Sequence, residues 1–366
     1  MSPRALALVD GEHYPAVVRD ALAQLPYEFV GAVLVGGTEK LRGDDLDYGV
    51  PLAATVEAGI ESHRPEIVVD LSDEPVLDPV TRFALASGAK GFTALAVVSL
   101  IEEGVLELST PARSVLGRDL PLIDDRVTVE HLLSHRSGIG DYLEEEAVEI
   151  EDYVMPVPVH ELATTEDYLA VLDGHPSTFA PGERFAYCNG GFVVLALIAE
   201  RAGGVSFHEL VEGRVCRPAG MVDTEFLRSD ELPARTATGY LEVDGAQRTN
   251  VFHLPVRGSG DGGIYSTAAD ISSLWRAFFA GRIVSAAWVA EMVRPRSDAP
   301  AHSKRYGLGF WLHASSDAVI LEGCDAGVSF RSVHNPHARA TFTVISNTAD
   351  GAWPIARFLE NEAGVL

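Results

Sequence analysis

The sequence predicts an α/β (α+β) fold in which a short βαβ segment precedes a larger region of helices and antiparallel strands. Three observations predict it. Strand-like and helix-like runs alternate up to residue 71, long apolar helices follow residue 87, and four strand-like runs joined by short turns occupy residues 306–347. Alternation favours a parallel, right-handed unit. Short turns between successive strands favour an antiparallel meander.

Residues 1–82 are expected to form a Rossmann-like βαβ segment. The expected strands are ALALV (5–9), FVGAVLV (29–35) and EIVVDL (66–71), and the expected helices are PAVVRDALAQL (15–25) and a segment near 52–63.

Residues 83–366 are expected to form the second domain, with a helical subdomain over about 105–260. Its first helix, 87–104, ends at Gly104, and Thr128 caps the next one. Further helices are expected at 129–135, 191–204, 269–281 and 353–362, the second of which has a glycine stop at Gly204. Strands are expected at 306–313, 318–323, 328–334 and 340–347.

Composition excludes several classes of partner. The chain has 366 residues and a net charge of −25, which argues against nucleic acid and anionic membrane as partners. No apolar run reaches the roughly 18 residues of a membrane span, and no secretion signal is recognised at the start, so a cytoplasmic location is expected. Three widely spaced cysteines (Cys188, Cys216 and Cys324) suggest reduced thiols, with no metal site and no cofactor.

The first candidate for chemistry is Ser87-Gly88-Ala89-Lys90 at the start of an apolar helix. Residues three apart on a helix share a face, so the hydroxyl and the ammonium can meet. The helix N-terminus favours negative charge at the hydroxyl, and a lysine in apolar surroundings can give up its proton and act as a base. The chain has only two other lysines, Lys40 and Lys304. The simpler interpretation is an exposed lysine one turn after a capping serine.

The second candidate is Tyr187-Cys188-Asn189, immediately before a buried helix. A phenol and an amide two residues apart in an extended loop point the same way. The phenol can relay a proton and the amide can hold a substrate carbonyl. Alternatively, the tyrosine packs on the core and the asparagine caps the helix.

The third candidate is Glu322-Gly323-Cys324-Asp325-Ala326-Gly327, at the start of a strand. Small residues there, Ala326 and Gly327 among them, allow a backbone to approach a substrate closely and a main-chain N–H to face an oxyanion. An ordinary glycine turn is the alternative.

Together, the S-x-x-K motif, the Y-x-N motif and their flanks resemble the serine β-lactamase and penicillin-binding-protein family over about 83–361, especially its class C, D,D-carboxypeptidase and esterase branches. VTVEHLLSHRSGIGDY is similar to the family's L-L-x-H-x-S-G segment, and GDGGIYSTAADISSLW to its G-G-x-x-S-T-x-x-D helix start. The resemblance implies a β-lactamase-like antiparallel sheet flanked by helices, with the site between the sheet and the helical subdomain.

The same resemblance implies a serine hydrolase that forms an acyl-enzyme on Ser87 with a small ester or amide, in the manner of an esterase, a peptidase or a β-lactamase. Lys90 and Tyr187 would share the acid and base roles. Asn189, Ala326 and Gly327 would bind substrate, beside an oxyanion hole that uses the Ser87 N–H and one strand N–H. His135 is interpreted as structural, bonded to loop backbone.

One departure from the family concerns its third motif, K-T-G or H-x-G. An ungapped match places Gly323 at the cation's position, and a small gap places Cys324 there. No cation is therefore offered to a substrate carboxylate, which favours esters or amides without one. Arg331 or another arginine is the possible replacement.

The second departure is that residues 4–86 resemble the N-terminus of the cyclic 2,3-diphosphoglycerate synthetases, through LALVDGEHYPAVVRDAL, VGAVLVGGTEKLRG and EIVVDLSDEPVL. We find no G-x-x-x-x-G-K-[ST] phosphate loop, so this segment is expected to keep the βαβ fold without the synthetase activity. The junction is placed near RFALAS. We hypothesise that the segment packs beside the hydrolase sheet without completing its antiparallel order.

Two alternatives to an active hydrolase remain from the sequence. One is a catalytically weak binding or regulatory protein with the β-lactamase fold, and the other is phosphoglycerate chemistry in the first domain. The substrate and the oligomeric state are not determined by the sequence.

Overall fold

The computed structural model describes residues 4–9, 28–34, 52–53, 67–71, 81–143, 153–243 and 246–362. The chain separates into two compact units, Met1–Thr81 and Arg82–Leu366. The helix expected at 15–25 lies outside the described residues, as does most of the helix expected near 52–63.

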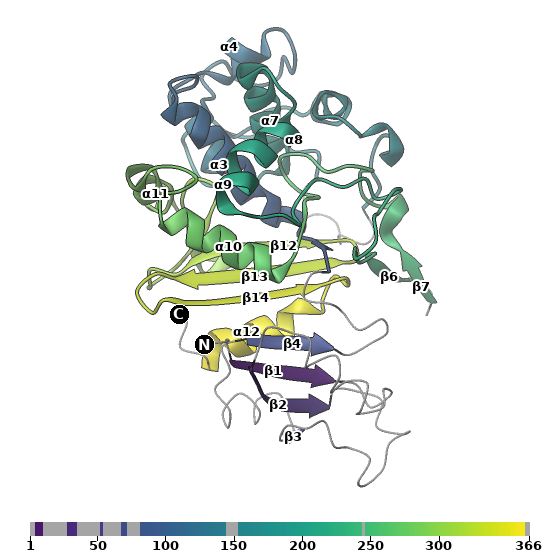
Figure 1. The fold of residues 1–366 in the computed structure, drawn as a ribbon. Coiled ribbons are helices and arrows are strands. Elements are labelled where there is room, and N and C mark those ends of the chain that lie inside the picture. The colour runs from purple at the N-terminus through teal and green to yellow at the C-terminus, as the bar shows by residue number, and fades with distance from the viewer. Residues whose placement is uncertain are drawn as a thin grey trace. The chain divides into compact units, whose positions relative to one another are not determined.

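The first unit contains a four-stranded parallel sheet in the order β3-β2-β1-β4 (Figure 1). Its strands are β1 (Arg4–Val9), β2 (Glu28–Leu34), β3 (Leu52–Ala53) and β4 (Ile67–Leu71). The three expected strands and their parallel pairing are confirmed. The expectation of a helix was wrong at residues 52–53, because they extend the ladder of β2 by pairing with Ala32 and Val33.

The second unit is built on a six-stranded antiparallel sheet in the order β14-β13-β12-β11-β10-β9, which confirms the predicted meander. The strands are β9 (Ser297–Ala299), β10 (Lys304–Tyr306), β11 (Trp311–His313), β12 (Val319–Asp325), β13 (Val328–Asn335) and β14 (Ala340–Ser346). Among the described strands, β1 to β4 pair only with one another. Neither 28–34 nor 67–71 therefore pairs antiparallel into the meander.

The single strand expected over 306–313 is divided into β10 and β11 by a glycine turn. Gly309 has φ +82°, a conformation that side-chain-bearing residues rarely adopt. A Cβ there would lie 2.1 Å from the Cβ of Ala94. A residue with a side chain would not fit at this turn, because the backbone there lies directly against the helix that contains Ala94.

That helix, α3 (Ala89–Glu102), is buried along nearly its whole length and packs against α7 (Asn189–Gly203). Its sequence is apolar on every side, as expected for a central core helix. Gly204 ends α7 in a left-handed conformation, as predicted. The other helices are α4 (Ala112–Leu116), α5 (Val129–Leu133), α6 (Leu169–Leu172), α8 (Phe207–Val211), α9 (Arg217–Ala219), α10 (Ala268–Phe279), α11 (Ala286–Met292) and α12 (Ala352–Glu362).

Shorter elements connect these helices. They are the 3-10 turns η2 (Ala86–Gly88), η3 (Val159–Glu161), η4 (Thr165–Tyr168), η6 (Asn250–Phe252) and η7 (Pro300–His302), the π-helical turn η5 (Glu212–Cys216), and the paired strands β5 (Phe83–Ala84) with β8 (Tyr265–Ser266) and β6 (Tyr240–Val243) with β7 (Ala246–Thr249). The β6–β7 hairpin was not anticipated in a region expected to contain mostly helices and loops.

Helices α10 and α12 pack on opposite faces of the large sheet. Trp275 of α10 donates a hydrogen bond to the Ser332 hydroxyl at 2.8 Å, while the neighbouring Arg331 pairs with Glu360 of α12. Successive strand residues face opposite sides, so the two helices lie on different sides of β13. Figure 1 shows β12, β13 and β14 side by side with these helices next to them.

The α12 side of the sheet carries a buried ionic network centred on Glu322 of β12. Its carboxylate pairs with Lys304 of β10 and Arg331 of β13. Burial raises the pKa of Glu322, but the two cations outweigh burial and the net shift is downward. The ionised Glu322 carboxylate and its two cationic partners therefore link β10, β12 and β13, and Arg331 extends the network to α12.

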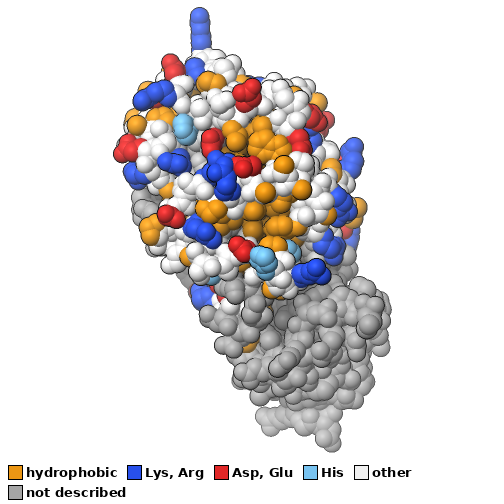
Figure 2. Space-filling model, turned by 90° about the vertical axis from the view of Figure 1, so that its left-hand side faces the viewer, with side chains coloured by type: hydrophobic (Ala, Val, Ile, Leu, Met, Phe, Trp, Pro, Cys, Tyr) orange, Lys and Arg blue, Asp and Glu red, His pale blue; other side chains and the backbone are white. Residues whose placement is uncertain are grey.

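Charges of both signs are mixed elsewhere on the larger unit. On the face shown in Figure 2, Lys and Arg side chains are interspersed with Asp and Glu around a group of apolar side chains. Exposed arginine–carboxylate pairs such as Arg214–Glu103 and Arg294–Glu291 occur on the larger unit. The net charge of −25 therefore does not produce a uniform acidic field on that face.

No single helix in the described ranges is long and apolar enough to cross a membrane; α7 and the segment Phe207–Ala219 pass that test only as a pair bent by 83°. Cys188, Cys216 and Cys324 are free thiols, which agrees with the sequence. Within the same ranges, no group of three or more His, Cys, Asp or Glu side chains could hold a metal ion.

Candidate active site

Ser87 is presented by a tight turn directly before α3. The preceding residue, Ala86, is buried and has φ 45°, a left-handed conformation that costs a non-glycine residue on the order of 1 kcal/mol. The turn is held by hydrogen bonds from the Leu85 N–H to the Ile264 carbonyl at 2.9 Å and from the Gly88 N–H to the Leu85 carbonyl at 2.8 Å. The fold thus fixes the serine hydroxyl at the start of the buried helix.

Lys90 is only 2% exposed and meets the serine as the S-x-x-K spacing predicts. Its ammonium donates to the Ser87 Oγ at 2.9 Å, to the Asn189 Oδ1 at 2.7 Å and to the Asp261 carbonyl oxygen at 2.8 Å. The alternative of an exposed lysine is wrong. Three oxygen acceptors satisfy the three donors of a buried ammonium.

Tyr187 and Asn189 reach the same place from the start of α7. The Tyr187 ring stacks on Trp311 with centroids 5.8 Å apart and 9° between the planes. The Lys90 Nζ lies 4.9 Å from the centroid of the Tyr187 ring. The structure therefore brings Ser87, Lys90, Tyr187 and Asn189 together, from the N-terminal ends of α3 and α7 and the residues just before them, as predicted from the two motifs.

His135 supports the loop that carries these residues. Its Nδ1 accepts a hydrogen bond from the Cys188 N–H at 3.1 Å. Burial, reinforced by the Lys90 cation, holds the pKa of His135 well below its usual value, so the ring is neutral and Nδ1 is its one acceptor. Because that acceptor is occupied, the ring has no lone pair left to take a proton. The predicted bond of His135 to loop backbone is confirmed.

Three acidic or phenolic residues near Lys90 were not singled out from the sequence. Asp141 accepts hydrogen bonds from the N–H groups of Asn189 and Gly190, and Tyr142 donates one to the Asp261 carboxylate. Asp141 and Tyr142 are the last two residues of VTVEHLLSHRSGIGDY, and Asp261 belongs to GDGGIYST. Their position within recognised motifs was the available signal, but their partners are up to 119 residues away.

The backbone of β12 approaches Ser87 at Gly323. A Cβ at Gly323 would lie 2.2 Å from the Leu85 carbonyl oxygen and 2.7 Å from the Ser87 backbone nitrogen. Only a glycine permits this approach. The Ser87 N–H and the β12 backbone are thus adjacent, which is the arrangement an oxyanion hole requires.

Ala326 and Gly327 lie further along, in the turn between β12 and β13. The Ala326 carbonyl accepts a hydrogen bond from the Asn250 side chain at 2.9 Å, and Gly327 has φ +69°. Neither residue belongs to the pocket lining described next. Their contact with substrate stays a prediction.

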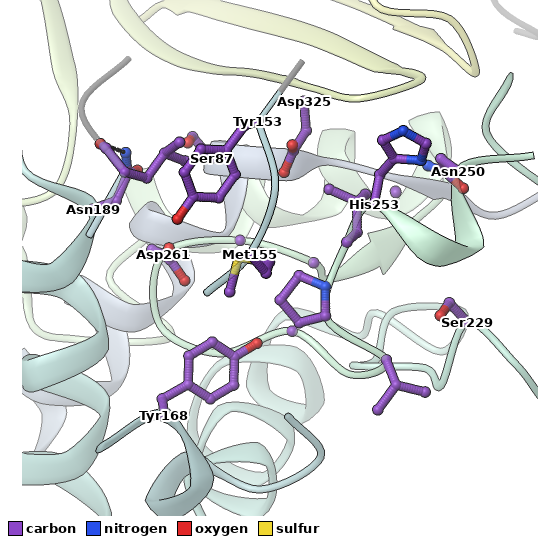
Figure 3. Close-up of a pocket in the computed structure, with 18 of the residues that line it drawn as sticks. Ser87, Tyr153, Met155, Tyr168, Asn189, Ser229, Asn250, His253, Asp261 and Asp325 are labelled. Atoms are coloured by element: carbon purple, nitrogen blue, oxygen red, sulfur yellow. Dashed lines mark hydrogen bonds between the residues drawn. The ribbon is translucent and has the colours of Figure 1, made fainter. Parts of the chain in front are cut away.

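A pocket of about 860 Å³, its open mouth included, adjoins Ser87. Figure 3 shows Ser87, Asn189 and Asp261 on one side of it, Asn250, His253 and Ser229 on the other, and Asp325 between them. Much of the remaining lining is apolar or aromatic: Leu143, Met155, Leu227, Leu254, Pro255, Val256, Tyr153, Tyr168 and Tyr265. Within the described part of the chain, the lining includes Asp261 and Asp325 and no lysine or arginine.

Arg331 does not supply the missing cation. It pairs with Glu322 and Glu360, and in the β12–β13 register it lies opposite Glu322, whereas Gly323 lies opposite Phe330. Neighbouring strand residues face opposite sides. The guanidinium is therefore on the face of the sheet away from Ser87, and the suggestion that it compensates for the third motif was wrong.

Comparison with known proteins places this geometry in a family. The sequence model of the β-lactamase family matches residues 62–362. This chain belongs to the β-lactamase family. The solved structure of a penicillin-binding protein from Bacillus halodurans superposes with a TM-score of 0.74 and 35% identity, covering 79% of this chain and 88% of that one. Among curated β-lactamase-family relatives, the esterase EstB of Burkholderia gladioli is 34% identical over 166 residues, 44% of this chain and 42% of the esterase.

The N-terminal resemblance is also confirmed. The N-terminal domain of cyclic 2,3-diphosphoglycerate synthetase matches residues 4–90. The synthetase of Rubrobacter xylanophilus is 45% identical over 102 residues, which are 24% of this chain and 23% of the synthetase. The two family matches overlap over residues 62–90, a range that contains the RFALAS segment.

Substitution of Gly323 by alanine is expected to lower turnover of an activated ester by roughly 10²- to 10³-fold, the loss found when an oxyanion-hole donor is removed. The new methyl group would collide with backbone atoms of Leu85 and Ser87, so the Ser87 N–H must move. Steady-state kinetics of Gly323→Ala measure the effect. Gly213→Ala is the matched control, because a Cβ at Gly213 meets no atom within 4 Å. Equal turnover in the two variants would contradict the assigned role of β12.

Proposed function

We propose that this protein is a serine hydrolase that cleaves small esters or amides through an acyl-enzyme on Ser87. The observation that carries the proposal is the buried Lys90 ammonium, whose Nζ lies 2.9 Å from the Ser87 Oγ beside an open pocket. The named relatives in the same family include an esterase, which supports ester chemistry.

In the proposed reaction, Lys90 first loses one proton to solvent and acts as a neutral amine together with Tyr187. The Ser87 Oγ attacks the substrate carbonyl carbon, and its proton passes to this Lys90–Tyr187 pair. The carbonyl oxygen becomes an oxyanion beside the Ser87 N–H and the β12 backbone. Collapse of this intermediate breaks the bond to the leaving group, which receives the proton, and leaves an ester on Ser87. Water, activated by the same pair, then attacks that ester, releases the acid and restores the hydroxyl.

The pocket lining favours substrates without a carboxylate. An anionic substrate would meet Asp261 and Asp325, and the nearby Lys90 is already bonded to Ser87, Asn189 and the Asp261 carbonyl. Apolar walls make such repulsion stronger than it would be in water. A neutral or amine-bearing acyl group with an apolar part matches this lining better than a penicillin-like acid.

The decisive experiment is intact-mass spectrometry of the full-length chain after incubation with a fluorophosphonate. We expect one covalent adduct per chain, mapped by digestion to the peptide that contains Ser87. The exposed Cys324 thiol is the competing nucleophile, so Cys324→Ser is the control and should label equally. Folded protein that forms no adduct would overturn the proposal. If such protein still bound esters without turnover, the catalytically weak binding protein would be the correct interpretation.

A matched pair of substrates tests the charge preference. We expect kcat/KM for 4-nitrophenyl hemisuccinate to be at least about tenfold below that for 4-nitrophenyl butyrate, equivalent to about 1.4 kcal/mol of repulsion. Asp325→Asn should narrow the difference, because it removes one of the two facing charges. A carboxylate substrate that is turned over as fast as the neutral one would show that another cation serves this pocket.

A further inference from the structure

Lys90 depends on two acceptors besides the serine, and each belongs to a different segment. Asn189 is the first residue of α7, and its Oδ1 lies 2.7 Å from Nζ. The Asp261 carbonyl belongs to the loop before β8 and lies 2.8 Å from Nζ. The direction of the ammonium is therefore set by how accurately α7 and this loop are held.

Asp141 holds the first of these segments. Its two carboxylate oxygens accept the Asn189 N–H at 2.6 Å and the Gly190 N–H at 2.8 Å. A Cβ at Gly190 would lie 3.2 Å from the same carboxylate, so the glycine allows the close approach. Two charge-assisted hydrogen bonds from consecutive residues fix both the position and the orientation of the first turn of α7.

Tyr142, the next residue, holds the second segment. Its hydroxyl donates to the Asp261 carboxylate, and the carbonyl of the same Asp261 accepts from Lys90. The phenol is thus bonded to one end of a residue whose other end contacts the ammonium. Thr93 of α3 also anchors this loop, through a 2.6 Å hydrogen bond to the Gly260 carbonyl.

We propose that Asp141 and Tyr142 are positioning residues that align Lys90 with the Ser87 hydroxyl, each by fixing one of the two other acceptors of its ammonium. The proposal rests on the function proposed above. Neither residue touches the Ser87 hydroxyl in the described hydrogen bonds. Both act through a partner: Asp141 through Asn189, and Tyr142 through Asp261. Asp141 and Tyr142, which are adjacent in the chain, thereby hold the two acceptors, Asn189 and Asp261, that orient the Lys90 amine.

The burial of these groups explains why they hold their partners so firmly. Burial is the main cause that raises the pKa of Asp141 and of Asp261, because a carboxylate loses hydration in this environment. The hydrogen bonds from Asn189, Gly190 and Tyr142 offset part of that loss. Breaking one of them would leave a buried oxygen without its donor, so each bond is strongly favoured.

The test measures the single-turnover rate of acylation of the full-length protein by 4-nitrophenyl butyrate, normalised to the fraction of sites that a fluorophosphonate titrates. We expect a loss of about 100-fold in Asp141→Ala and a smaller loss in Asp141→Asn, which keeps one acceptor oxygen. Tyr142→Phe should lose about tenfold. Small misplacements of a catalytic group have effects of this size. KM of Asp141→Asn should change less than twofold.

Ser134→Ala is the matched control. Ser134 is a buried residue of the same segment, but its hydroxyl bonds to the Glu130 carbonyl at 2.7 Å and not to the Lys90 network. It should acylate at the wild-type rate per titrated site. If Asp141→Asn and Tyr142→Phe also acylate at that rate, and differ only in thermal stability, the positioning role is wrong. A wild-type protein that fails to titrate at all would instead reject the hydrolase function.

Discussion

Ser87→Ala should abolish turnover of activated esters, with a fall in kcat/KM on the order of 10⁴ to 10⁶, as in other hydrolases that lose their nucleophile. The substitution removes the Oγ that Lys90 contacts at 2.9 Å and leaves that lysine with its bonds to Asn189 and Asp261. Because the buried ammonium keeps two acceptors, the free energy of unfolding should change by only about 1 kcal/mol. Steady-state kinetics and chemical denaturation measure the two quantities separately.

The control for this variant is Ser99→Ala, a second buried serine on α3. Its hydroxyl bonds to the Ala96 carbonyl at 2.7 Å, far along the helix from the pocket. Ser99→Ala should keep the wild-type kcat/KM. Residual activity above about 1% in highly purified Ser87→Ala would mean that another group, such as the exposed Cys324 thiol, carries the covalent step.

Lys90→Met and Lys90→Arg should each slow acylation by roughly 10² to 10⁴, the usual contribution of a general acid or base. Methionine removes the proton acceptor and the charge, whereas arginine keeps the charge but does not give up its proton near neutral pH. A lysine that acts only as a fixed positive charge would be replaced by arginine with little loss. If Lys90 takes the serine proton, both the methionine and the arginine variant should acylate slowly.

The two variants should also differ from Ser87→Ala in stability. Lys90→Met leaves the Asn189 Oδ1 and the Asp261 carbonyl without their donor, at a cost of about 1 to 3 kcal/mol for each unsatisfied group. Single-turnover rates per titrated site, together with thermal unfolding, separate the catalytic loss from the structural one. If Lys90→Arg acylates at nearly the wild-type rate, another group must act as the base, and Lys90 contributes only its positive charge.

Local patterns in the sequence were sufficient to predict that Ser87 and Lys90 meet and to predict the sheets that surround them. A serine and a lysine three residues apart at the start of an apolar helix are expected to share a face. Lys90 lies in the first turn of α3 and Ser87 in the η2 turn directly before it. Alternation of strand and helix predicted the parallel sheet of the first unit, and short turns predicted the antiparallel sheet of the second. Where local chemistry decided an element, as at Thr128 and Gly204, the prediction was confirmed.

Contacts between distant segments could not be predicted in the same way. The approach of Gly323 to the Ser87 nitrogen depends on how β12 packs against the turn before α3. The pairing of Arg331 with Glu322 and Glu360, which removes it from the site, depends on strand register. A one-residue change of register would reverse that outcome, since strand side chains alternate between faces.

The sequence by itself determined the proposed nucleophile Ser87, its neighbouring lysine and the family to which this protein belongs, because each depends on residues close together in the chain. Only the tertiary structure decided what surrounds Lys90: Asn189, 99 residues away, and Asp261, 171 residues away. Asp141 and Tyr142 hold these two partners. A buried ammonium needs hydrogen-bond acceptors, and these are supplied by whichever segments folding brings next to it. The spacing of residues along the chain does not reveal which segments those are.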